Sequence, residues 1–173
     1  APYPYSLARQ GGLGLSHWVT TGNEAAVSVA DVIEWLAGDD DTRVILAYIE
    51  GARDGAALRR ALAKARAAGK PVIVTKVGRT EAGARAAMSH TASLSGEDAV
   101  YQAVFDATGA IRARTVDEMF RLGQAFATGA LPAGRRLAIV TVSGGVGTLM
   151  ADAGSDEGLL LPPLPAPIAA ALR

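Results

Sequence analysis

The sequence contains no cysteine, few aromatic residues and no excess of charge of either sign. The absence of cysteine excludes disulfides, thiolate chemistry and cysteine-ligated metals. Lys plus Arg and Asp plus Glu both total 17, so no basic field would attract nucleic acid or an anionic membrane surface. No apolar run approaches the roughly 20 residues that span a bilayer, and the first residues lack the pattern of a signal peptide. We therefore expect no nucleic-acid or membrane partner and a cytoplasmic location.

The sequence does contain enough apolar residues for a sizeable core, since half of its 173 residues are hydrophobic. Apolar runs alternate with segments of helical periodicity. Strands are predicted at 13–21, 42–51, 71–79, 110–113 and 137–142, the second and third being continuous apolar runs typical of strands covered on both faces. Helices are predicted at 27–38, 54–70, 97–109 and from Thr115 onward, where Glu118 is placed to complete a capping box.

This alternation of strands and helices predicts an α/β fold with a parallel, doubly wound sheet. Gly, Pro and Ala are concentrated in "TGALPAGRR", which indicates a boundary. We expect a first domain at 1–128, a linker at 129–135 and the incomplete beginning of a second α/β domain at 136–173.

In a parallel sheet, ligands bind outside the carboxyl ends of the strands. Gly22 and Asn23 follow the first predicted strand, and Glu50 lies at the end of the second. Glu50 is either an acid emerging into solvent or a carboxylate that fixes a histidine tautomer and stabilises an imidazolium. Lys76 and Arg79 lie at the end of the third predicted strand and form either a solvated rim or a phosphate or carboxylate contact.

A glycine-rich turn precedes the helix predicted after residue 142. Its residues are Ser143, Gly144, Gly145, Val146 and Gly147. Backbone N–H groups at a helix N-terminus favour anions. No lysine follows the glycines as in a P-loop, and their spacing differs from the dinucleotide-binding fingerprint.

His90 lies among small hydroxyl residues in "RAAMSHTASLSGED". It is either a capping or hydrogen-bonding residue or a functional one. A metal site is disfavoured because His17 is the only other histidine, and a serine hydrolase is disfavoured because no G-x-S-x-G elbow occurs. The functional role that remains is a histidine nucleophile that carries a transferable group.

Three segments together resemble the nucleoside-diphosphate-forming acyl-CoA synthetases, relatives of the succinyl-CoA synthetases. They are "GLSHWVTTGNEAAVSVADVIEWLAGDDDTRVILAYIEG", "KPVIVTKVGRTEAGARAAMSHTASLSG" and "AIVTVSGGVGTLMADA". The resemblance implies a flavodoxin-like fold and a phosphohistidine mechanism that converts acyl-CoA, phosphate and NDP to carboxylic acid, CoA and NTP. It assigns the phosphohistidine to His90, its facing carboxylate to Glu50, and a helix N-terminus aimed at the phosphoryl group to 143–147. Ala92 stands where the family more often has glycine.

The resemblance also implies what accompanies this chain. The family has a CoA-binding domain and an ATP-grasp domain, on the same chain or a partner subunit, and uses CoA, ATP or ADP and Mg²⁺. We expect the first strand of the flavodoxin-like domain to be missing, no ligand bound by motifs within the chain itself, an oligomer, and little activity of the isolated chain. Two alternatives stay open: a non-catalytic acyl-CoA- or nucleotide-sensing module, alone or fused to a GNAT-type acetyltransferase, and a receiver-type signalling domain. The receiver reading lacks the required aspartate at a strand end.

Overall fold

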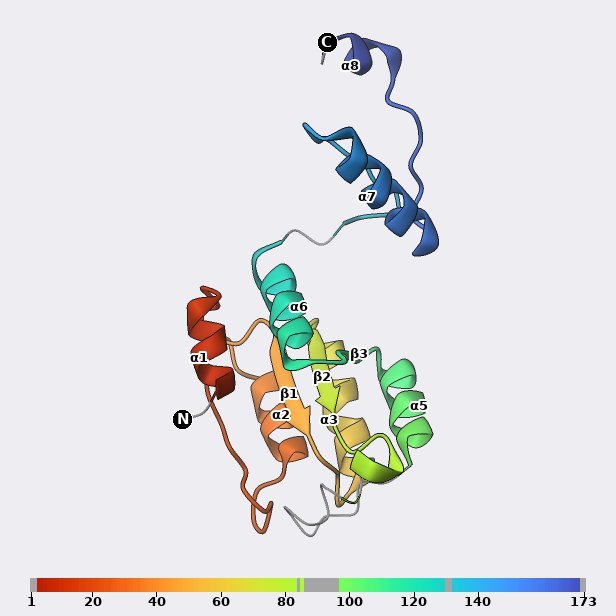
Figure 1. The fold of residues 1–173 in the computed structure, drawn as a ribbon. Helices are drawn as coiled ribbons and strands as arrows, with labels where there is room; N and C mark the ends of the chain where they lie inside the picture. The colour runs from red at the N-terminus through yellow and green to blue at the C-terminus, as the bar shows by residue number, and fades with distance from the viewer. Residues whose placement is uncertain (1–2, 84, 86–96, 130–131, 172–173) are drawn as a thin grey trace. The chain divides into compact units, whose positions relative to one another are not determined.

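The computed structural model describes residues 3–83, 85, 97–129 and 132–171. Its contacts divide the chain into two compact units, Ala1–Gly129 and Ala130–Arg173 (Figure 1). Within the described ranges, no helix is long and apolar enough to cross a membrane.

The first unit is built around a three-stranded parallel sheet in the order β1-β2-β3. Its elements are α1 (Tyr3–Gln10), α2 (Val29–Ala37), β1 (Ile45–Ile49), α3 (Gly55–Ala67), β2 (Val72–Lys76), α5 (Asp98–Thr108), β3 (Ile111–Arg112) and α6 (Val116–Thr128). Ile49 pairs with Lys76 and Val74 pairs with Arg112. The carboxyl ends of the three strands therefore lie at one edge of the unit. The predicted α/β fold with a parallel sheet is confirmed.

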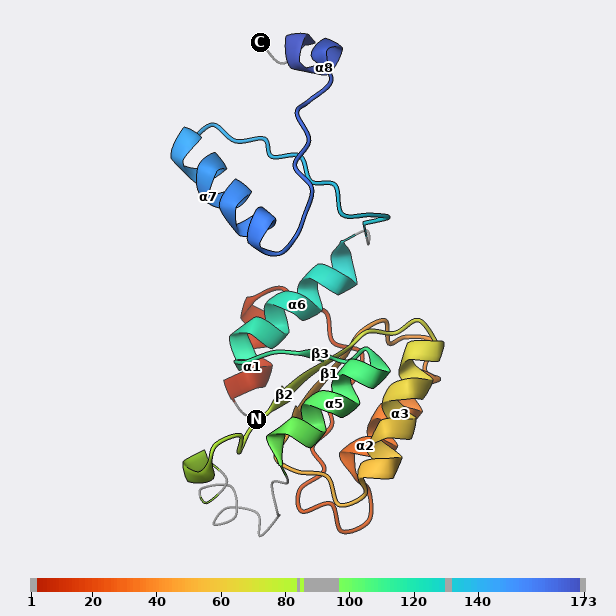
Figure 2. The same ribbon diagram turned by 90° about the vertical axis from the view of Figure 1, so that its right-hand side faces the viewer.

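Helices cover both faces of this sheet, as expected for a doubly wound arrangement (Figure 2). On one face, alternate residues of β1 and β2 pack against α2, α3 and α5 around the fully buried Phe105. On the other face, Ile73 packs against Ala113 and Met119, with the apolar side of α6 beside them. Side chains alternate between the two faces because successive residues of a strand point in opposite directions.

Local hydrogen bonds fix where the helices begin. Ser28 and Asp31 form a capping box at α2, with each side chain bonded to the other residue's backbone N–H. Thr115 caps α6 by accepting a hydrogen bond from Glu118 N–H at 3.1 Å. The reciprocal half of the predicted box differs, because the Glu118 carboxylate accepts from Arg114 N–H instead.

Two predicted strands are wrong. Residues 13–21 and 137–142 are not strands; an isolated bridge between Arg136 and Leu160 lies just before the second range. A strand requires a partner at ladder distance, and β-forming composition alone does not supply one. The helix α1 is an element that the sequence did not predict.

The second unit contains α7 (Gly144–Asp156) and α8 (Ala166–Ala171). Leu137 N–H donates to the Leu160 carbonyl at 2.8 Å, which ties the segment before α7 to the segment after it. Gly154 is the only buried residue among those described in this unit, and several large apolar side chains, including Val142 and Leu149, are exposed.

Candidate functional site

Glu50 directly follows β1 at the carboxyl edge of the sheet. Its side chain is half-buried, with Oε2 shielded from solvent. Two residues further on, Ala52 N–H donates a 2.8 Å hydrogen bond to the hydroxyl of Tyr101 in α5. The turn that carries Glu50 is therefore attached to a helix far away in the sequence.

Lys76 ends β2 next to this turn and is buried, with only 3% of its surface exposed. Its Nζ lies 4.7 Å from the centroid of the Tyr101 ring and donates to the Val77 carbonyl. Burial lowers the pKa of Lys76; the charges of Asp98 and Glu50 oppose this shift, while the charge of Arg112 adds to it. The Lys76 ammonium is therefore buried at the carboxyl edge of the sheet and is not part of a solvated rim.

Asp98 and Arg112 complete a group of four charged side chains, which we call the edge cluster: Glu50, Lys76, Asp98 and Arg112. Arg112 forms an ion pair with Asp98 through Nη2 and donates to Gln102 Oε1 at 3.0 Å through Nη1. The sequence analysis did not single out Asp98, Tyr101 or Arg112. An arginine within a short apolar strand was the available signal, because a half-buried cation requires an acidic partner.

Gly22 and Asn23 form an exposed turn between the segment after α1 and the start of α2. Gly22 has φ +59°, in the left-handed region that glycine adopts at little cost. Glu24 next to them accepts from Val29 N–H at 3.0 Å and from the Thr21 hydroxyl at 3.3 Å. Burial raises the pKa of Tyr101, the hydrogen bond from Ala52 N–H lowers it, and the charge of Glu24 raises it.

A large cavity joins the Gly22 turn to the Glu50 turn. Its volume is about 1000 Å³, and it lies between residues 13–24 and the edge of β1, with α2 and α6 on its two sides. Gly22, Asn23 and Glu50 all line it. The structure therefore brings three of the sequence-predicted site residues to one cavity, with Lys76 close enough to Glu50 for their charges to interact.

The remaining predicted site residues are placed differently. Arg79 is exposed three residues beyond the end of β2. His90 lies outside the described residues. Ser143–Gly147 belong to the second unit, where Ser143 is the N-cap of α7 and accepts from Val146 N–H at 3.4 Å. Ser143–Val146 are exposed, but Ser143 N–H donates to Thr141 Oγ1, Val146 N–H to Ser143 Oγ and Gly147 N–H to the Ser143 carbonyl. The N–H groups of Gly144 and Gly145 are the ones left for a ligand.

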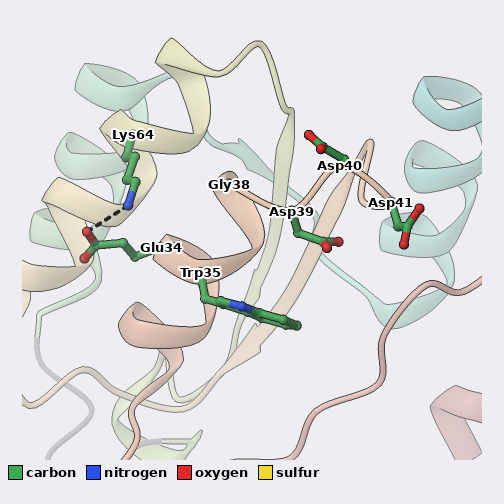
Figure 3. A pocket seen from close by; sticks show the side chains of 7 residues that line it. All are labelled: Glu34, Trp35, Gly38, Asp39, Asp40, Asp41 and Lys64. Atoms are coloured by element: carbon green, nitrogen blue, oxygen red, sulfur yellow. Dashed lines mark hydrogen bonds and ion pairs between the residues drawn. The ribbon is translucent and has the colours of Figure 1, made fainter.

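A second, acidic hollow of about 580 Å³ lies before the amino end of β1 (Figure 3). Its lining residues are Glu34, Trp35, Gly38, Asp39, Asp40, Asp41 and Lys64. Glu34 is paired with Lys64 at 3.1 Å, and Asp39 bonds to His17 Nε2 at 3.1 Å. The Thr42 hydroxyl is the main group that lowers the pKa of Asp39. In the described part of the chain, no three His, Asp or Glu side chains are grouped to hold a metal ion.

Comparison with known sequences identifies relatives with named activities. The sequence is 44% identical over 149 residues to the alpha subunit of acetate–CoA ligase [ADP-forming] I of Pyrococcus furiosus, which covers 86% of this chain and 32% of that protein. It is 40% identical over 143 residues to the 4-hydroxybutyrate–CoA ligase [ADP-forming] of Nitrosopumilus maritimus, covering 82% of this chain and 20% of that protein. The chain thus spans about a third or less of the length of these curated relatives.

The fold is likewise similar to a solved structure. The dinucleotide-forming acetyl-coenzyme A synthetase 1 of Ca. Korarchaeum cryptofilum, in complex with phosphate and ADP, matches with a TM-score of 0.85 and 34% identity, over 92% of this chain and 35% of that one. Residues 4–126, most of the chain, match the family described as the succinyl-CoA ligase like flavodoxin domain. The chain therefore belongs to the succinyl-CoA ligase like flavodoxin domain family, as the resemblance in its motifs implied.

Proposed function

We propose that this chain is the histidine-bearing part of an NDP-forming acyl-CoA synthetase. The reaction is acyl-CoA + phosphate + NDP to carboxylic acid + CoA + NTP, reversible at each step. The family membership supports the reaction class, and the named activities of the relatives are ADP-forming CoA ligases. The observation that carries the proposal is that Glu50 and Lys76 share the sheet edge from which the segment containing His90 leaves and to which it returns.

Chain connectivity explains why this edge matters for His90. The segment leaves the sheet after Lys76 and rejoins the described fold at Glu97, the N-cap of α5. Both anchor points lie at the carboxyl edge, where ligands bind in open parallel sheets. In sequence, His90 therefore falls between two anchor points at the edge that carries Glu50.

The proposed chemistry has three steps. A phosphate oxygen attacks the acyl carbon of acyl-CoA, the C–O bond forms, and CoA leaves as its thiolate. An imidazole nitrogen of His90 then attacks the phosphorus of the acyl phosphate, and the carboxylate leaves with the electrons of the P–O bond. In the last step a terminal oxygen of NDP takes the phosphoryl group, which restores His90.

Glu50 and the turn before α7 have distinct roles in this proposal. A carboxylate bonded to the other imidazole nitrogen keeps the attacking nitrogen unprotonated and offsets the positive charge formed on the ring. Within the turn Ser143–Gly147, the N–H groups of the exposed Gly144 and Gly145 are the proposed donors to the phosphoryl oxygens, as helix N-termini are for phosphate. Gly22, Asn23, Lys76 and Arg79 are proposed to contribute phosphate or substrate contacts; of these, Lys76 acts through its charge because it is buried.

Domain boundaries and partners follow the same proposal. We assign 1–128 to a flavodoxin-like phosphohistidine domain, 129–135 to a linker and 136–173 to the start of a second α/β domain. A CoA-binding domain and an ATP-grasp domain would hold CoA and the nucleotide with its Mg²⁺, in a cytoplasmic oligomer. The second unit buries little apolar surface among its described residues, which is consistent with further polypeptide packing on it.

The cavity beside β1 supports the assignment of a further strand to the flavodoxin-like domain. Among the described residues β1 pairs only with β2, and the bonds from Ile45 N–H and to the Ile49 carbonyl face that partner. The backbone groups of Leu46 and Tyr48 therefore point into the cavity, by the alternation of a parallel ladder. Residues of α2 and α6 line two sides of the cavity. A further strand in the cavity would therefore be covered by a helix on each face, as in a doubly wound sheet.

The decisive experiment is phosphate labelling of the complete enzyme that contains this segment. Incubation with γ-labelled ATP and Mg²⁺ should give an acid-labile, base-stable phosphoprotein, and His90→Asn should abolish the label. Glu50→Gln should slow labelling without unfolding the protein. Equal labelling of wild type and His90→Asn would refute the phosphohistidine assignment. No label on either, with ligand-dependent control of a partner's activity, would instead indicate a regulatory module.

A further inference from the structure

We infer that Tyr101 is a positioning residue: its hydroxyl holds the turn that carries Glu50 in register with the helix that follows the His90 segment. This inference rests on the proposed function. The contact behind it is the 2.8 Å hydrogen bond from Ala52 N–H to the Tyr101 hydroxyl. Ala52 is separated from Glu50 by Gly51 alone, so the anchor is close to the carboxylate.

The turn needs an anchor for a physical reason. β1 ends at Ile49 and α3 begins at Gly55, so the residues between them have no ladder or helix to fix them. A glycine directly after Glu50 adds backbone freedom. The hydrogen bond to Tyr101 restrains this turn from outside its own sequence neighbourhood.

The Tyr101 side chain is well suited to serve as that anchor. Its ring lies against Lys76 Nζ at 4.7 Å and against the Phe105 ring at 6.2 Å between centroids. Phe105 is fully buried, which fixes α5 on the sheet. The ion pair of Arg112 with Asp98 and its bond to Gln102 attach the first turns of the same helix to β3.

Helix α5 therefore links the turn of Glu50 to the point where the chain arrives from the segment that contains His90. Its N-cap, Glu97, is the point where the chain returns from the His90 segment, and one turn later Tyr101 holds the turn of Glu50. The carboxylate acts on the imidazole only at hydrogen-bond distance, and small displacements of reacting groups lower rates steeply. Loss of the Tyr101 hydroxyl should therefore slow phosphorylation of His90 through Glu50.

Tyr101→Phe in the complete enzyme is the sharpest test, because it removes the acceptor oxygen and keeps the ring contacts with Lys76 and Phe105. Tyr5→Phe, in α1, is the matched control. We expect Tyr101→Phe to lower the single-turnover rate of His90 labelling by about tenfold, with a fall in Tm of only a few degrees. Tyr5→Phe should leave the labelling rate unchanged.

A double-mutant cycle distinguishes positioning from a general loss of structure. If Tyr101 acts through Glu50, Tyr101→Phe should cost little further rate in the Glu50→Gln background. Multiplicative rate losses, or a Tyr101→Phe rate equal to wild type, would overturn the inference while leaving the phosphohistidine in place. Absence of label on the wild-type enzyme would overturn the proposed function and this inference with it.

Discussion

Replacing Lys76 by methionine tests the description of the edge cluster most directly. Lys76→Met keeps a side chain of similar length while removing a buried ammonium. The substitution removes the cation–π interaction with Tyr101, worth about 1–2 kcal/mol when desolvated, and a hydrogen bond to the Val77 carbonyl worth about 1.5–3 kcal/mol. It also removes the attraction of the Asp98 and Glu50 charges, which repulsion from Arg112 partly cancels. Against them stands the desolvation of the ion, several kcal/mol in real proteins. We expect the free energy of unfolding at pH 7 to change by no more than about 1 kcal/mol.

The pH dependence of the same variant follows from the direction of the Lys76 shift. Burial lowers the pKa of Lys76 in the folded chain below the unfolded value of 10.5. Between these two pKa values the unfolded chain binds more protons, so the stability of the wild type rises with pH. Burial raises the pKa of Tyr48 and Tyr101, so their contribution falls with pH above 10.0. Both tyrosines are present in the variant, and the difference between the two proteins isolates Lys76.

The assay is urea unfolding followed by circular dichroism, at several pH values from 7 to just above 10. Lys64→Met is the matched control, because Lys64 is 52% exposed and forms an exposed ion pair with Glu34. Wild type should gain stability over Lys76→Met as the pH approaches 10.5, and no such trend should appear for Lys64→Met. A loss above about 2 kcal/mol at pH 7, or a pH-independent difference, would refute the account of a buried ammonium at this position.

Two further substitutions test the packing beneath the site by the same unfolding assay. Leu62 in α3 is only 1% exposed, and Leu62→Ala should lower the free energy of unfolding by about 2–5 kcal/mol. Val100 in α5 is 57% exposed, and Val100→Ala should change it by less than about 0.5 kcal/mol. Equal effects of the two substitutions would contradict the described core. Gly109→Ala should cost about 1–2 kcal/mol, because Gly109 ends α5 at φ +72° with Arg66 beside it. Gly55 is the first residue of α3 and has free space around its Cα. Gly55→Ala should therefore leave stability unchanged or raise it, and a destabilisation would contradict this account of the two glycines.

The strands at the centre of the fold could be predicted because burial on both faces leaves a continuous apolar run. β1 and β2 lie within the predicted ranges 42–51 and 71–79, each shorter than predicted. The helix start at Thr115 was readable from its cap, since a threonine side chain satisfies an exposed N–H of the first turn. Both signals come from neighbouring residues in the sequence, and the structure shows the burial and the hydrogen bond that they predict.

Strands that depend on a partner elsewhere could not be predicted in this way. Residues 13–21 and 137–142 have the composition of strands, but the backbone groups of a strand must meet a neighbour about 4.8 Å away. Next to 13–21 the structure has a cavity of about 1000 Å³. Beside 137–142 the described residues form a single isolated bridge, between Arg136 and Leu160, which lies outside that range. Composition reports how well a residue suits a sheet and carries no information about whether a neighbour is present.

The contacts of the candidate site were hidden from the sequence for a similar reason. Glu50 and Lys76 were identified because each follows an apolar strand. Tyr101 was not, because its bond to Ala52 joins residues 49 positions apart and its spacing to Phe105 reads as an ordinary helix face. A hydrogen bond that crosses between elements becomes visible only when the register of those elements is known.

The charge of the edge cluster bears on the role that our proposal gives to the turn before α7. Its two acids and two bases sum to zero, and both cations already have partners, Lys76 at Tyr101 and the Val77 carbonyl and Arg112 at Asp98. A phosphoryl group on His90 would bring nearly two negative charges to an edge whose cluster has no net positive charge. The N–H groups at the start of α7 add positive potential without adding a titratable group. Because the cluster's own cations are engaged, our proposal assigns charge stabilisation of a phosphohistidine to the turn Ser143–Gly147 rather than to Lys76.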